Sequence, residues 1–115
     1  MDTSKEIEFQ KRLMATFKIE AAEHVESITS GLLTLEKTTD SNRFKAELEI
    51  VFRESHSLKG AARAVSLVQI EGICKSLESI FMLLKQGEIS LESISYDTMH
   101  QSIDYIGKIL LRNDN

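Results

Sequence analysis

The stretch "AVSLVQIEG", Ala64 to Gly72, decides whether the middle of this chain is one long helix or two helices. Its apolar residues continue at helical spacing, and no strong helix breaker interrupts them. Only Ser66, a residue whose side chain competes for backbone hydrogen bonds, indicates a stop. A single bent helix and a helix–turn–helix both fit this stretch. We expect a turn, because a reversal here lets the chain form a compact core.

Working outward from this turn, apolar residues recur at three- and four-residue steps in four segments. Proline, the strongest helix breaker, is absent from the chain. The loop "TTDSN" separates the first two segments, and Gly87 stands where a left-handed helix cap belongs. The fold class expected is all-α, an antiparallel up-down four-helix bundle, because short connections place successive helices side by side. The four helices are expected at about 5–37, 43–65, 68–86 and 91–111.

The spacing also predicts which side chains face the core. Those expected inside are Phe9, Leu13, Phe17, Ala21, Val25, Ile28, Leu32 and Leu35; Phe44, Leu48, Val51, Ser55, Leu58, Ala62 and Val65; Ile70, Ile73, Cys74, Leu77, Ile80, Phe81 and Leu84; and Met99, Ile103, Ile106 and Leu110.

Composition limits the class of protein. The chain has 115 residues, 42% hydrophobic and 28% charged, which suits one soluble domain spanning 1–115. The net charge is −4 and the basic residues are scattered, which argues against a nucleic-acid partner. A single cysteine cannot form an internal disulfide, and no Cys/His spacing predicts a metal site. With no signal peptide or membrane span in the sequence, the cytoplasm is the expected compartment and no membrane insertion is expected.

An unusual group of residues lies in the second predicted helix, in "HSLKGAA". At about 100° per residue, His56 falls on the shoulder of the apolar face. Phe52, Lys59, Gly60 and Arg63 lie within roughly 60° of it on the same helical wheel. Gly60 costs about 1 kcal/mol relative to alanine inside a helix, but it leaves a gap through which a partner's backbone can approach.

The third predicted helix supplies a carboxylate at the same level. If the chain reverses near Leu67, Glu78 lies as far after the turn as His56 lies before it. A carboxylate there could accept a hydrogen bond from one imidazole nitrogen and leave the other free as a nucleophile. With cations nearby, the exposed ring is a candidate phosphoryl acceptor. The alternative is a half-buried histidine that a surface glutamate satisfies.

These residues resemble a known family. "HSLKGAA", His56 to Ala62, is similar to the His-x-x-Lys-Gly signature of histidine phosphotransfer (HPt) domains. The wider match, over about residues 10–105, is closest to the N-terminal phosphotransfer domain of CheA-type chemotaxis histidine kinases. The resemblance implies that His56 is the phosphorylated residue and that Lys59, the lysine beside it, assists the phosphate electrostatically. It also implies that Gly60 leaves room for a partner and that Glu78 accepts the hydrogen bond that orients the ring. Arg63 and Ser66 depart from the family pattern.

The resemblance also implies the partners of the site. A histidine kinase catalytic domain, using ATP and Mg, would phosphorylate His56, and a response-regulator receiver would take the phosphoryl group onto an aspartate. The domain itself would then be a carrier without a cofactor of its own and not an enzyme, with Phe52, Gly60 and Arg63 at the docking surface. We expect the isolated domain to be a monomer. We also expect it to be the N-terminal fragment of a longer histidine kinase.

Two other classes of protein are considered. A helical interaction or dimerisation module would use the same apolar faces and keep His56 as a structural residue. A metal-binding bundle would need inward Glu-x-x-His spacings, which the chain lacks. His24 and His100 are interpreted as boundary or surface residues, and Cys74 as a small hydrophobic core residue.

Overall fold

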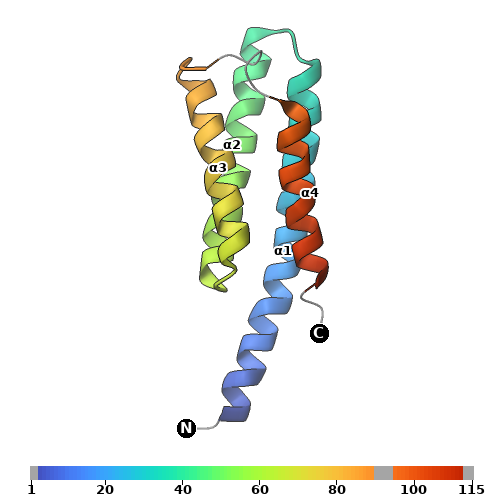
Figure 1. Ribbon diagram of the computed structural model, residues 1–115, viewed down its shortest axis with the longest axis vertical. Coiled ribbons are helices and arrows are strands. Elements are labelled where there is room, and N and C mark those ends of the chain that lie inside the picture. The colour runs from blue at the N-terminus through green and yellow to red at the C-terminus, as the bar shows by residue number, and fades with distance from the viewer. Residues whose placement is uncertain (1–2, 90–94, 113–115) are drawn as a thin grey trace.

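The computed structural model describes residues 3–89 and 95–112, and within these ranges the chain is entirely helical apart from its turns. The all-α class predicted from the sequence is confirmed. In Figure 1 the colour gradient ascends α1, descends α2, ascends α3 and descends α4. Helix α2 packs against α1 and α3, and α4 packs against α1 and α3. The helices are α1 (Thr3–Lys37), α2 (Ser41–Ala64), α3 (Val68–Lys85) and α4 (Tyr96–Arg112).

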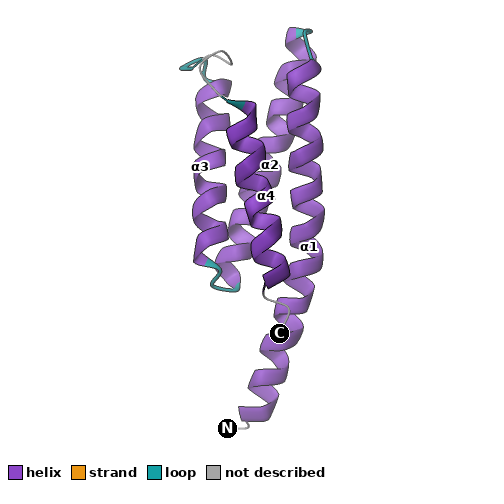
Figure 2. Ribbon diagram, turned by 45° about the vertical axis from the view of Figure 1, so that its right-hand side comes forward, coloured by secondary structure: helices purple, strands orange, loops and turns teal. Residues whose placement is uncertain are grey.

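The bundle core is made of the apolar stripes of all four helices, with α4 in front of α2 in the view of Figure 2. Side chains predicted to be inside are buried along most of each stripe. The fully or nearly buried members are Phe17, Ala21, Ile28, Leu32, Leu35, Leu48, Val51, Ser55, Leu58, Ala62, Ile70, Cys74, Leu77, Phe81, Met99, Ile103, Ile106 and Leu110.

The start of α1 corrects the prediction for two residues. Phe9 and Leu13 were expected in the core, but 60% and 42% of their surfaces are exposed. Helix α1 continues past the end of the bundle, so no neighbouring helix lies beside these residues (Figure 1). Periodicity marks an apolar face but does not say whether another helix reaches it.

The α2–α3 connection is a turn rather than a bend in one helix. The N–H of Leu67 donates to the carbonyl of Ala62 at 2.9 Å, and the N–H of Ser66 donates to Arg63 at 3.1 Å. This pair of bonds is the Schellman motif, which needs a left-handed residue at its centre. Ser66 occupies that position with φ 62°, a conformation that glycine adopts at lower cost.

The same motif ends α3. Gly87 has φ 72°, and the N–H groups of Gly87 and Glu88 donate to Leu84 and Leu83 at 3.2 and 2.9 Å. The left-handed cap predicted at Gly87 is therefore confirmed.

The start of α4 differs from its predicted position near Leu91. Residues 90–94 lie outside the described part of the chain, and the first described residue after them, Ser95, is not helical. Its hydroxyl accepts a hydrogen bond from the N–H of Thr98 at 3.2 Å, so Ser95 caps a helix that begins at Tyr96. Among the described helices, none is both long and apolar enough to cross a membrane.

Two glycines inside helices have opposite surroundings. A Cβ added to Gly31 on α1 would overlap the γ1 methyl of Val51 on α2, so the two helices approach closely there. A Cβ added to Gly60 would meet no atom within 4 Å. Gly31 therefore has a packing role in this bundle, whereas Gly60 has no packing role in the isolated domain.

We predict that Gly31→Ala lowers the free energy of unfolding by about 1–3 kcal/mol, as overpacking does. Gly60→Ala, the matched control, should raise it by about 0.5–1 kcal/mol because alanine favours a helix and the site is open. Urea unfolding followed by circular dichroism measures both. Equal changes in the two variants would contradict the close α1–α2 contact.

Candidate functional site

The site predicted from the sequence lies on the α2–α3 hairpin, and the side chain of His56 is exposed there. The His56 side chain is 65% exposed, and its Nδ1 lies 3.1 Å from Oε2 of Glu78 on α3. A carboxylate can only accept, so Nδ1 carries the proton that it donates to Glu78. In the neutral ring this leaves Nε2 with a free lone pair. The register that pairs these two residues across the turn is the one expected from a reversal near Leu67.

Lys59 lies one turn after His56, and its amine contacts Glu78. The Nζ atom lies 3.0 Å from Oε1 and 2.8 Å from Oε2 of Glu78. The side chains of Lys59 and Glu78 are 26% and 20% exposed, so this ion pair is mostly shielded from water. The structure therefore pairs the amine of Lys59 with Glu78, a contact that was not predicted from the sequence.

The pKa of Glu78 reflects these contacts. Partial burial alone would raise it, but the hydrogen bonds from Lys59 and His56, together with the positive charge of Lys59, outweigh burial and lower it. Glu78 is therefore an anion at neutral pH. An anionic acceptor on Nδ1 fixes the tautomer of His56 and stabilises positive charge on the ring.

The three residues predicted to contact a partner surround this group. Gly60 and Arg63 are exposed on α2, and Phe52 is half-buried one turn before His56. Phe52 also lines a depression of about 320 Å³ on the α2–α3 surface, together with Glu78, Ser79, Met82 and Leu83. The depression therefore adjoins the site through Glu78, which contacts His56.

One ionic cluster near the site was not predicted. Glu49 on α2 binds Lys85 of α3 at 2.6 Å and Arg53 at 3.1 Å, and the amine of Lys85 lies 5.2 Å from the centre of the Phe52 ring. The hydrogen bond from Lys85 holds the pKa of Glu49 below its ordinary value. The Glu49–Lys85 pair could have been predicted from the sequence. These two residues lie at equal distances before and after Leu67, as His56 and Glu78 do.

Each of the other two histidines also pairs with a glutamate on another helix. His24 Nδ1 lies 2.6 Å from Oε2 of Glu54, and His100 Nε2 lies 3.1 Å from Oε1 of Glu36. About a quarter or less of each ring is exposed. Within residues 3–89 and 95–112, no cluster of three or more potential ligands could hold a metal ion.

Cys74 is fully buried, as the sequence predicted. Burial, helped by the negative charge of Glu78, raises the pKa of its thiol to about 12. At neutral pH the thiol is protonated, and it packs as a small hydrophobic side chain.

Comparison with known proteins agrees with the resemblance seen in the sequence. The family model of the Hpt domain matches residues 12–108, and the chain belongs to this family. The chain is 26% identical over 101 residues to the chemotaxis protein CheA of Cereibacter sphaeroides, covering 88% of this chain and 15% of that protein. It is 24% identical over 100 residues to CheA of Treponema pallidum, with 87% and 12% covered.

A gliding motility regulatory protein of Myxococcus xanthus is 28% identical over 109 residues, which is 95% of this chain and 13% of that protein. The chain thus spans about one seventh of the length of these relatives or less. No solved structure matches it. Family membership supports the role of a phosphocarrier domain in two-component signalling.

The lowered pKa of Glu78 predicts a pH dependence of stability. Its ordinary value is 4.5, so the unfolded chain protonates Glu78 at a higher pH than the folded domain does. The stability that this carboxylate contributes is present above the unfolded pKa and is lost as pH falls through the folded pKa. Between about pH 5 and pH 3, Glu78→Gln should therefore lose less stability than the wild type.

The measurement is urea unfolding at each pH. Glu71→Gln is the matched control, because it removes a carboxylate from the same helix away from His56 and should keep the wild-type slope. Parallel curves for Glu78→Gln and the wild type would contradict the stabilised carboxylate.

Proposed function

We propose that this domain is a phosphocarrier whose acceptor atom is Nε2 of His56. The observation that carries the proposal is the exposed imidazole whose Nδ1 donates to an anionic glutamate, in a chain of the Hpt family. The partners proposed are a histidine kinase catalytic domain, which binds ATP and Mg, and the receiver domain of a response regulator. The domain itself holds no cofactor in this proposal, and it is a substrate of both reactions rather than an enzyme.

The two transfers use the same nitrogen. In the first, the lone pair of Nε2 attacks the γ-phosphorus of ATP bound to the kinase, the P–N bond forms, and ADP leaves with the electrons of the broken P–O bond. In the second, a carboxylate oxygen of the receiver aspartate attacks the phosphorus, and the P–N electrons return to Nε2. Phosphoryl transfer needs mainly position and charge stabilisation from protein groups, and the exposed ring admits both partners.

Glu78 and Lys59 act on the ring rather than on the phosphate. When Nε2 attacks, the imidazole gains positive charge, and the Nδ1–H···Oε2 hydrogen bond to Glu78 strengthens. Lys59 keeps Glu78 ionised and holds both of its oxygens. Gly60, Phe52 and Arg63 supply the docking surface around the ring, with Gly60 clearing space for the partner's backbone.

The longer protein that we propose around this domain is a histidine kinase of the chemotaxis type. The support is that the matched regions of the CheA proteins cover most of this chain but a small share of theirs.

We predict that a histidine kinase catalytic core with ATP labels the chain with a phosphate that is stable in base and labile in acid. His56→Gln should abolish the label. His24→Gln, the matched control, removes another glutamate-paired ring and should keep it. Label that persists in His56→Gln would overturn the assignment of the acceptor.

We also predict that Glu78→Gln slows phosphorylation about 10- to 100-fold, since a charge-assisted hydrogen bond contributes about 1.5–3 kcal/mol. Because Lys59 acts through Glu78, Lys59→Met should add little to the defect of Glu78→Gln in the double variant. Single-turnover rates with one kinase core measure all three variants. If the rate defects of the two single variants multiply in the double variant, Lys59 acts independently of Glu78, on the phosphate.

A further inference from the structure

The charged residues around His56 form a basic surface on an acidic chain. We use the name histidine face for the surface of α2 and α3 whose side chains lie within about 60° of His56 or of Glu78 on the two helical wheels. Its acidic residues are Glu49, Glu71 and Glu78. Its basic residues are Lys45, Arg53, Lys59, Arg63, Lys75 and Lys85.

The charge of the histidine face is opposite in sign to that of the rest of the chain. The face has six basic and three acidic residues, a net charge of +3, whereas the other eight basic and fifteen acidic residues carry −7. The basic residues are scattered along the sequence, and the α2–α3 hairpin brings six of them onto one side. Such a separation of charge attracts a partner whose own surface is negative.

Three of the six cations are engaged within the domain. Lys59 contacts Glu78 at 2.8 Å, and Lys85 and Arg53 contact Glu49 at 2.6 and 3.1 Å. In the described part of the chain, the side chains of the other three form no ion pair and no hydrogen bond. Their positive charge is therefore available to a partner.

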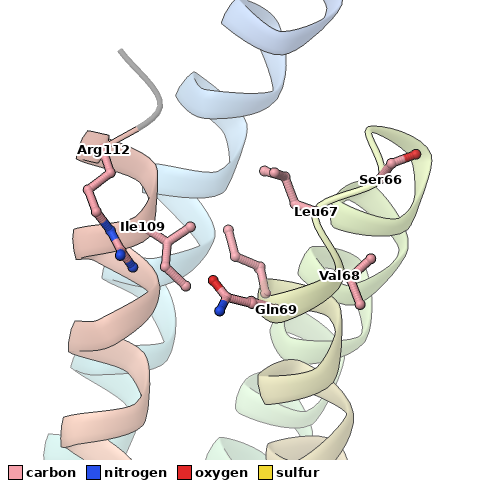
Figure 3. Close-up of a pocket in the computed structure, with 7 residues that line it drawn as sticks. Ser66, Leu67, Val68, Gln69, Ile109 and Arg112 are labelled. Atoms are coloured by element: carbon pink, nitrogen blue, oxygen red, sulfur yellow. The ribbon is translucent and has the colours of Figure 1, made fainter. Parts of the chain in front are cut away.

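Arg63 and Lys75 are the two cations without a partner that lie nearest to His56. Arg63 lies two turns after His56 on α2, about 10 Å along the axis. Lys75 lies three residues before Glu78 on α3, and both cations are exposed. The turn between Arg63 and Glu71 carries only uncharged side chains (Figure 3).

A partner that reaches Nε2 of His56 must also cover these two cations. Protein interfaces take roughly 600–800 Å² from each partner, and a circle of that area has a radius of about 14–16 Å. The domain measures only 22 by 20 Å across its long axis, so the contact must extend further along the helices. Gly60 lies between His56 and Arg63, and a Cβ there would meet no atom within 4 Å, so a partner's backbone can approach.

We propose that Arg63 and Lys75 are specificity-determining residues that steer the receiver domain, by its carboxylates, onto His56. This inference rests on the proposed function. In the longer protein proposed above, the kinase catalytic domain is tethered to this domain, so its effective concentration is about millimolar without any steering. The receiver arrives by diffusion and presents a carboxylate to Nε2, and opposite charge raises the rate of that encounter.

The acidic residues of the histidine face favour a protein partner over a nucleic acid. Glu49, Glu71 and Glu78 alternate with the cations along the hairpin. They interrupt the continuous basic stripe that a phosphate backbone selects. A protein surface can match such mixed charges residue by residue.

Transfer rates at two salt concentrations test the proposal. The chain carrying phosphate on His56 is mixed with a receiver domain that accepts the phosphoryl group from the wild type. At about 0.02 M salt, Arg63→Gln/Lys75→Gln should lower the second-order rate constant about 3- to 30-fold, with the rate at saturating receiver unchanged. At about 0.5 M salt, where the Debye length is about 4 Å, the difference should disappear.

Two matched variants separate steering by charge from other effects. Arg63→Lys/Lys75→Arg keeps both charges and should transfer at the wild-type rate. Lys11→Gln/Lys108→Gln removes the same charge from α1 and α4, away from the histidine face, and should also keep the wild-type rate.

The same variants are labelled by a separate kinase core with ATP, and Arg63→Gln/Lys75→Gln should label as fast as the wild type. An equal loss with the kinase core and with the receiver would overturn the assignment to the receiver. Binding of duplex DNA at 0.15 M salt that Arg63→Gln/Lys75→Gln abolishes would assign the face to nucleic acid instead. A chain that takes no label on His56 would show that the proposed function fails. A labelled chain whose transfer at low salt ignores the double substitution would show that only this inference fails.

Discussion

The reversal of the chain between α2 and α3 determines the geometry of the candidate site. Two backbone hydrogen bonds, from Leu67 to Ala62 and from Ser66 to Arg63, close the turn and set the register of the two helices. Each residue of α2 from 49 to 64 then has a counterpart on α3. A slip of one helical turn would separate His56 from Glu78, as it would separate Glu49 from Lys85. Ser66 adopts a left-handed conformation at this point, so the register is held by the motif despite an unfavourable residue.

The electrostatics of the site depend on the carboxylate of Glu78, which is partly buried and accepts hydrogen bonds from two side chains. Burial alone would favour the protonated form of Glu78, which would leave the orientation of the His56 ring undefined. Donors from Lys59 and His56 reverse that preference. The imidazole can then stay exposed to its partners and still keep one tautomer, because the Glu78 carboxylate that orients it is partly buried in the α2–α3 hairpin.

Much of this arrangement could be predicted from the sequence, because it depends on local periodicity. The helical class, the cap at Gly87 and the inward stripe of α4 each depend on residues near one another in the chain. The equal spacing of His56 and Glu78 around Leu67 was also readable, once a turn was assumed. The start of α4 was misplaced because Ser95 caps the helix through its own side chain, which periodicity alone does not register.

By itself, the sequence determined the helices, their apolar faces and the candidate acceptor His56, since these depend on spacing along one chain. Only the tertiary structure decided that Lys59 contacts Glu78, because the reach of a long side chain across two helices depends on their packing. It also decided that Phe9 and Leu13 are exposed, although their spacing equals that of core residues. Burial depends on where the neighbouring helices end, and that is a property of the assembled bundle rather than of any one segment.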